Sequence, residues 1–185
     1  MRSILGIGLA ALVLSACIVE APSSESPDAQ TPRARSVKPA GPLTVKSGAV
    51  LGDKVELVGA TFQPGTLVPG QPMRVTLYFR ALDTVPADYS VFVHMEDPDG
   101  KLQRANFDHP PAGGKYPTSQ WKKGDLVRDE FTVFLAPEAQ ARAVNLLVGL
   151  WDPKTDARLP LTNPEKVRND GQSRVFIAQV PVAQF

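Results

Sequence analysis

Alternation of apolar and polar residues is the pattern that most constrains this chain. In residues 73–81 the odd positions hold Met, Val, Leu, Phe and Ala, and Arg or Thr stands at most positions between them. Residues 89–96 repeat the pattern. A period of two is typical of a strand with one buried face. Further strands are expected at residues 54–62, 102–107, 127–135, 143–151 and 174–182.

Clusters of Pro, Gly, Asn and Asp separate these segments, as turns require. The clearest is Asp97-Pro98-Asp99-Gly100, which predicts a hairpin. Only residues 137–143 look helical, and the 18 prolines argue against a helical bundle because Pro breaks helices. The predicted fold is all-β: an antiparallel β-sandwich of immunoglobulin-like or jelly-roll type, with seven to nine strands over residues 49–185.

The N-terminus predicts a lipoprotein signal peptide. Residues 4–14 form an uncharged, largely apolar run of a length that suits a signal peptide and is too short to span a bilayer. The sequence Leu14-Ser15-Ala16-Cys17 resembles the lipobox of bacterial lipoproteins. That resemblance implies cleavage before Cys17, diacylglycerol on its thiol and a further acyl chain such as palmitate on its amino group, which together form a stable anchor. An ordinary secretory signal followed by a chance cysteine is the alternative.

Residues 17–48 are expected to be a disordered tether. They are rich in Pro and Ser and contain no aromatic residue, so they cannot bury enough apolar surface to offset the entropy of ordering. Ile18 follows the cysteine where enteric bacteria place Asp to retain a lipoprotein in the inner membrane. The expected location is therefore the cell envelope, anchored by lipid in the outer membrane, with residues 1–16 removed.

Charge and cysteine content exclude several classes of protein. The formal net charge is +1, which gives no basic excess for neutralising phosphates, so nucleic acid is not an expected partner. The single cysteine excludes a disulfide within the chain.

Short motifs between residues 57 and 161 carry a family resemblance. They are VTLYFRA at 75–81, DYSVFVH at 88–94, DPDG at 97–100, PTS at 117–119, VGLWD at 148–152 and RLP at 158–160. They resemble a β-sandwich module found at the C-terminus of some bacterial membrane glycosyltransferases and in stand-alone envelope proteins. The catalytic part of those enzymes lies in a membrane-spanning region. The resemblance therefore implies an accessory, extracytoplasmic module and transfers no catalytic residue.

No nucleophile or metal motif is evident. Ser90, Ser119 and Ser173 do not lie in G-x-S-x-G, and His94 and His109 have no spacing typical of zinc ligands. We expect no enzyme, cofactor or metal. Three alternatives stay open: a Ser119, His109 and Asp108 grouping, a glycan hydrolase using Asp108 and Asp129 as paired carboxylates, and calcium held by Asp108, Asp125 and Asp129.

The strands predict apolar groups on a second face. If the odd residues of 73–81 and 89–95 point inward, Tyr78, Phe92 and His94 point outward, as do Leu147 and Trp151 in the later strand. Residues 108–124, with Tyr116 and Trp121, form a long excursion that could cover this face. Either Trp121 packs over Phe92 and Tyr78 with His94 hydrogen-bonded beneath it, or the aromatic rings form a platform for sugars. The candidate ligand or partner surface is Tyr78, Phe92, His94, Asp108, Tyr116, Trp121 and Trp151.

The expected function is a non-catalytic binding or assembly subunit of a cell-envelope complex. Its expected partners are the membrane, through the N-terminal lipid, and an envelope protein or a glycan. A carbohydrate-binding module for cell-surface glycan or exopolysaccharide is the first alternative, and the hydrolase is the second.

Overall fold

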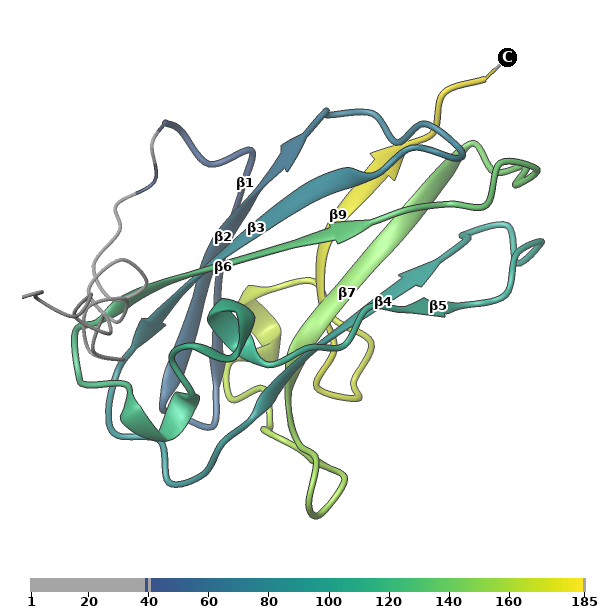
Figure 1. The fold of residues 1–185 in the computed structure, drawn as a ribbon. Helices are drawn as coiled ribbons and strands as arrows, with labels where there is room; N and C mark the ends of the chain where they lie inside the picture. The colour runs from purple at the N-terminus through teal and green to yellow at the C-terminus, as the bar shows by residue number, and fades with distance from the viewer. Residues whose placement is uncertain (1–38, 40, 185) are drawn as a thin grey trace, which may run out of the picture.

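The computed structural model describes residue 39 and residues 41–184, which form two antiparallel sheets packed face to face (Figure 1). Sheet 1 has the order β1-β2-β3-β6, and sheet 2 has the order β5-β4-β7-β8, with β9 also paired to β7. The strands of sheet 1 are β1 (Val45–Leu51), β2 (Val55–Gln63), β3 (Met73–Ala81) and β6 (Leu126–Val133). Those of sheet 2 are β4 (Ser90–Glu96), β5 (Ala105–Asn106), β7 (Ala143–Asp152), β8 (Ala157–Arg158) and β9 (Val175–Pro181). The prediction of an all-β, antiparallel sandwich is confirmed.

Three short 3-10 helices complete the described part of the chain: η2 (Pro111–Gly114), η3 (Thr118–Gln120) and η4 (Pro164–Lys166). No helix in residue 39 or residues 41–184 is long and apolar enough to cross a membrane. The predicted signal peptide, Cys17 and most of the predicted tether lie outside the described residues.

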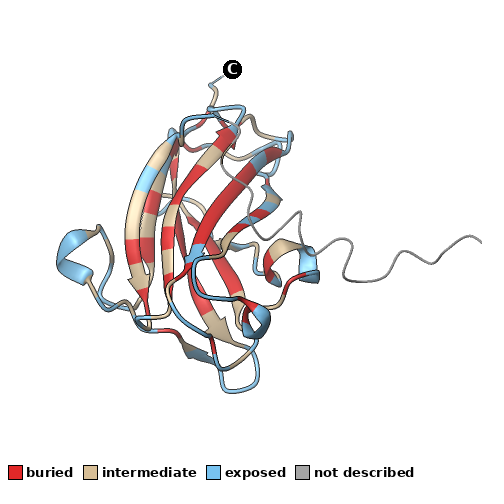
Figure 2. Cartoon of the chain, turned by 90° about the vertical axis from the view of Figure 1, so that its left-hand side faces the viewer, coloured by how far each residue is buried: buried red, intermediate tan, exposed pale blue. Residues whose placement is uncertain are grey.

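The core lies between the sheets, where buried positions face one another (Figure 2). The odd residues of β3 and β4 belong to it, including Leu77, Phe79 and Val93, as the alternation predicted. In β7 the even positions, such as Leu146 and Val148, point inward in the same way. Tyr78, Phe92 and Leu147 are also buried but stand outside this cluster, on the outer faces.

The first strand begins earlier than the sequence pattern indicated. β1 starts at Val45, so part of the segment predicted as tether is folded. A register shift between Lys46 and Ala49 interrupts the alternation, which hides the strand in the sequence. Gly59 lies opposite the shift, and only glycine fits there, because a Cβ would lie 2.2 Å from the carbonyl oxygen of Val45.

Two other local predictions change. Residues 137–143 form no helix: Pro137 and Glu138 make a turn, in which the Ala139 N–H donates to the Ala136 carbonyl at 3.0 Å, and Ala143 already begins β7. So short a segment cannot offset the cost of helix nucleation. The hairpin at Asp97–Gly100 is confirmed, but its second strand is only Ala105–Asn106. The Asp97 carboxylate accepts the N–H groups of Lys101 and Leu102, which holds that stretch out of the sheet.

The excursion at residues 108–124 carries the chain from sheet 2 to sheet 1, and its aromatic rings enter the core. Tyr116 and Trp121 are each only 1% exposed. The Trp121 ring lies 5.9 Å from that of Phe79, and its Nε1 donates to the Tyr116 carbonyl at 2.9 Å. The prediction that Trp121 packs over Phe92 and Tyr78 is therefore wrong, because the ring fills space between the sheets.

A buried ion pair fastens the excursion to β6. Asp129 is 0% exposed; its Oδ2 lies 2.8 Å from His109 Nε2, and its Oδ1 accepts the Ala112 N–H at 2.9 Å. His109 Nδ1 lies 2.7 Å from the Phe107 carbonyl, so both ring nitrogens face acceptors and both carry hydrogen in the imidazolium form. Burial alone lowers the pKa of His109, but the hydrogen bond and charge of Asp129 outweigh it and raise the pKa above its ordinary value.

This ion pair predicts a pH-dependent stability. A raised pKa in the folded state stabilises the protein fully below the ordinary histidine pKa of about 6.5, and the contribution disappears as pH rises through the folded-state value. The difference in unfolding free energy between wild type and His109→Gln, from urea denaturation at several pH values, is expected to shrink from pH 6 towards pH 9. A difference that stays constant with pH contradicts the assignment.

Candidate functional site

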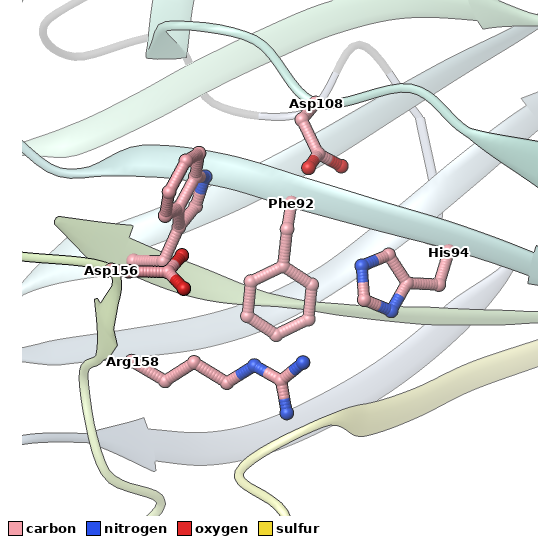
Figure 3. A pocket seen from close by; sticks show the side chains of 6 residues that line it. Phe92, His94, Asp108, Asp156 and Arg158 are labelled. Carbon is pink, nitrogen blue, oxygen red and sulfur yellow. The ribbon is translucent and has the colours of Figure 1, made fainter. Parts of the chain in front are cut away.

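A hollow of about 430 Å³ opens on the outer face of sheet 2 (Figure 3). Phe92 and His94 enter it from β4, Trp151 from β7 and Arg158 from β8. The loop after β5 and the β7–β8 turn complete the lining. Those loops contribute Asp108 and Asp156.

Strand pairing brings these side chains together. Phe92 pairs with Gly149, and Trp151 pairs with both Ser90 and Arg158. A Cβ on Gly149 would lie 2.4 Å from Phe92 Cζ, so the glycine is what allows the Phe92 ring to lie across β7. The missing side chain of Gly149 therefore makes room for one of the two rings that line the hollow.

Two rings form the bottom of the hollow. Phe92 and His94 are 2% and 5% exposed, and their centroids lie 4.9 Å apart. The Arg158 guanidinium lies 5.1 Å from the centre of the Phe92 ring, within cation–π range, and donates to the Gln172 carbonyl at 2.9 Å. Arg158 forms no ion pair with a carboxylate of the described residues.

Arg174 stands behind His94. Its Nη1 lies 3.2 Å from His94 Nδ1 and 2.5 Å from Glu96 Oε1, and its Nε lies 2.5 Å from Asp170 Oδ2. Burial opposes the charge of Arg174, but the bonds to Glu96 and Asp170 raise its pKa.

The environment keeps His94 uncharged at neutral pH. Burial is the largest cause of the lowered pKa of His94, and the positive charges of Arg104, Arg174 and Arg158 add to it. Asp108 acts in the opposite direction, and its effect is smaller than that of burial.

Trp151 contributes an unsatisfied donor. Its Nε1 is buried and is the one such side-chain nitrogen or oxygen without a hydrogen-bond partner among the described residues. Buried polar groups are normally paired, so this enclosed donor is an exception, and a ligand in the hollow would reach it only if the Trp151 side chain moved. The Trp151 side chain itself is half-buried.

The two carboxylates at the rim are held differently. Asp108 Oδ1 accepts the Val93 N–H at 3.0 Å, which fixes the side chain over β4. Asp156 adopts φ 59° in the β7–β8 turn, and its N–H donates to the Asp152 carbonyl at 2.8 Å. Non-glycine residues seldom adopt this left-handed conformation, which here places Asp156 beside the hollow.

The structure gathers four of the seven residues predicted for the surface: Phe92, His94, Asp108 and Trp151. Tyr78 lies on the outer face of sheet 1 beside a separate hollow, and Tyr116 and Trp121 are in the core. Arg158, Asp156, Gly149 and Arg174 were not among the residues predicted for this surface. The turn sequence Asp152-Pro153-Lys154 could have indicated Arg158, because a hairpin at this turn brings Arg158 back beside Trp151.

The alternative sites are not assembled. Asp129 is buried with both oxygens bonded, and both nitrogens of His109 have partners, so neither is free to act with Asp108 or Ser119. Asp125 accepts the Tyr116 hydroxyl and the Lys122 N–H. In residue 39 and residues 41–184, no three His, Cys, Asp or Glu side chains are grouped closely enough to hold a metal ion.

No family model and no curated protein matches this sequence. Among solved structures, a Niemann-Pick type C2 protein from the Japanese carpenter ant has 10% identity and a TM-score of 0.40, covering 76% of this chain and 98% of that chain. The C-terminal domain of wzt has 13% identity and a TM-score of 0.47, covering 84% of this chain and 86% of that chain.

Gly149→Ala tests the construction of the hollow. The added methyl group would collide with the Phe92 ring and lie 3.0 Å from the Ser173 carbonyl oxygen, so we expect a loss of about 1–3 kcal/mol of unfolding free energy. Urea denaturation followed by tryptophan fluorescence measures it. Gly65→Ala is the matched control, since no atom lies within 4 Å of its Cβ position. Equal stabilities of the two variants contradict the packing described.

Proposed function

We propose that this protein is a lipid-anchored, non-catalytic binding protein of the bacterial cell envelope, and that the hollow on sheet 2 binds a glycan. The observation that carries the proposal is the combination of an aromatic wall with polar groups of both kinds around one concave site. Binding pockets typically combine apolar walls with a few well-placed polar groups.

The composition of the hollow suits a sugar. Trp151 offers an apolar ring surface for a pyranose face. Arg158 supplies hydrogen-bond donors, and Asp108 and Asp156 supply acceptors. Sugar hydroxyl groups both donate and accept hydrogen bonds, so both kinds of protein group find a partner on one ring.

Binding rather than catalysis is favoured by how the candidate acids and bases are used. Paired-carboxylate hydrolysis needs two acidic groups that face a cleft, and Asp129 is enclosed with His109. Asp108 is tied to the backbone of Val93 through one oxygen.

Assembly with an envelope protein is the second candidate. Phe134 is 59% exposed beside a groove of about 540 Å³ that Phe107 and Leu135 also line. An exposed aromatic at an apolar groove is a feature of protein contacts. Crosslinking and recovery from solubilised membranes, compared between wild type and Phe134→Ala, tests this candidate.

Trp151→Ala is expected to weaken glycan binding by at least about tenfold, because truncating an aromatic anchor in a binding site removes much of the binding energy. A glycan array identifies the bound sugar, and titration of that sugar gives the affinities. Phe134→Ala is the control, since it removes an exposed aromatic ring that does not line the hollow. Unchanged binding by the Trp151 variant, or binding of no glycan by wild type, removes the support for this function.

The proposed anchor is tested at Cys17. In a bacterial host, wild type is expected to incorporate an alkyne-labelled palmitate and to fractionate with outer membranes, and Cys17→Ser is expected to lose both properties, because the sole cysteine thiol carries the diacylglycerol. Mass spectrometry of the mature N-terminus completes the measurement. An unacylated Cys17, or full membrane retention of the serine variant, contradicts the anchor.

A further inference from the structure

We propose that Arg174 fixes His94 as a hydrogen-bond donor, and that His94 and Asp108 together receive one uncharged hydroxyl group of the ligand. The hollow then selects neutral sugars over acidic ones. This inference rests on the proposed glycan binding and specifies the chemistry of the sugar. Arg174 acts as a positioning residue, because it acts on the ligand only through His94.

The first step is the tautomer of His94. A guanidinium has hydrogens on all its nitrogens and can only donate, so the contact between Arg174 Nη1 and His94 Nδ1 makes Nδ1 the acceptor. A neutral imidazole with an accepting Nδ1 carries its hydrogen on Nε2. Arg174 is itself held by Glu96 and Asp170, and its side chain is 13% exposed, so it cannot readily move away.

The second step is the direction of that donor. Figure 3 shows the His94 ring with one nitrogen facing the space between Phe92 and Asp108 and the other turned away. The facing nitrogen is Nε2, the ring nitrogen not bonded to Cγ. None of the described residues forms a hydrogen bond with Nε2.

The third step is the acceptor across that space. Asp108 Oδ1 accepts the Val93 N–H, and no described residue forms a hydrogen bond with Oδ2. A ligand group between an N–H and a carboxylate must accept from one and donate to the other. A hydroxyl does both, whereas the carboxylate of an acidic sugar accepts from His94 but is repelled by Asp108.

The tautomer is measured by ¹⁵N NMR on the full chain labelled at histidine. The chain has only two histidines, so the spectrum of His109→Gln shows which signals belong to His94. We expect wild type at pH 7 to show the Nε2–H form at His94, Arg174→Gln to lose this preference, and Arg174→Lys to keep it because lysine also donates. Arg80→Gln is the control, since it removes an exposed arginine paired with Glu56 on sheet 1. An Nδ1–H form in wild type, or no change in Arg174→Gln, overturns the role of Arg174.

Selectivity is measured by affinity electrophoresis of the same proteins in gels containing dextran, mannan or polygalacturonate. We expect a neutral polymer to retard wild type and polygalacturonate not to. Loss of a hydrogen bond predicts about tenfold weaker binding in Arg174→Gln, and Asp108→Asn is expected to lose discrimination against the acidic polymer. Stronger retardation by polygalacturonate overturns the selectivity. If no gel retards wild type and the array detects no bound glycan, the proposed function is overturned. The NMR measurement of the His94 tautomer still tests the role of Arg174, independently of glycan binding.

Discussion

Strand β4 buries side chains on both of its faces, and the site depends on this. Val91 and Val93 pack between the sheets, and Phe92 and His94 pack on the outside of sheet 2. An outer face with buried rings needs a cover, which here comes from charged side chains rather than from a third layer. Arg158 lies over Phe92, and Arg174 reaches His94. The same cover makes the face a polar-rimmed hollow, because a guanidinium shields a ring while keeping its own donors near water.

Ion pairs hold the side chains around the hollow in fixed positions. The Arg174 guanidinium forms ion pairs with both Glu96 and Asp170 and fixes the accepting nitrogen of His94. His109 and Asp129 fix the start of the excursion at residues 108–124, next to Asp108. The two histidines have pKa values shifted in opposite directions: burial, aided by nearby arginines, lowers the pKa of His94, whereas the hydrogen bond and charge of Asp129 outweigh burial and raise the pKa of His109. The environment of His94, which lines the hollow, favours the neutral form, and that of His109, which serves the fold, favours the charged form.

Much of the fold was accessible from the sequence, because alternation is a local property. The limits of β3 and the inward faces of β3, β4 and β7 followed directly from it. The start of β1 did not, because a bulge breaks the alternation where Gly59 meets Val45. The excursion was also misjudged: its length predicted a cover, but local sequence carries no information on which of two apolar surfaces Trp121 will meet.

The sequence alone determined that the chain forms strands, which side chains share a strand face, and that an outer face would hold Phe92, His94 and Trp151. It also contains the lipobox-like segment, which depends on local motif alone. Only the tertiary structure decided that Tyr116 and Trp121 enter the core, that Asp129 is enclosed with His109, and that Arg158 and Arg174 complete the hollow. These outcomes depend on residues as many as 80 positions apart, as for His94 and Arg174. Such contacts form through strand pairing and the turns between strands, and they leave no periodic trace in the sequence.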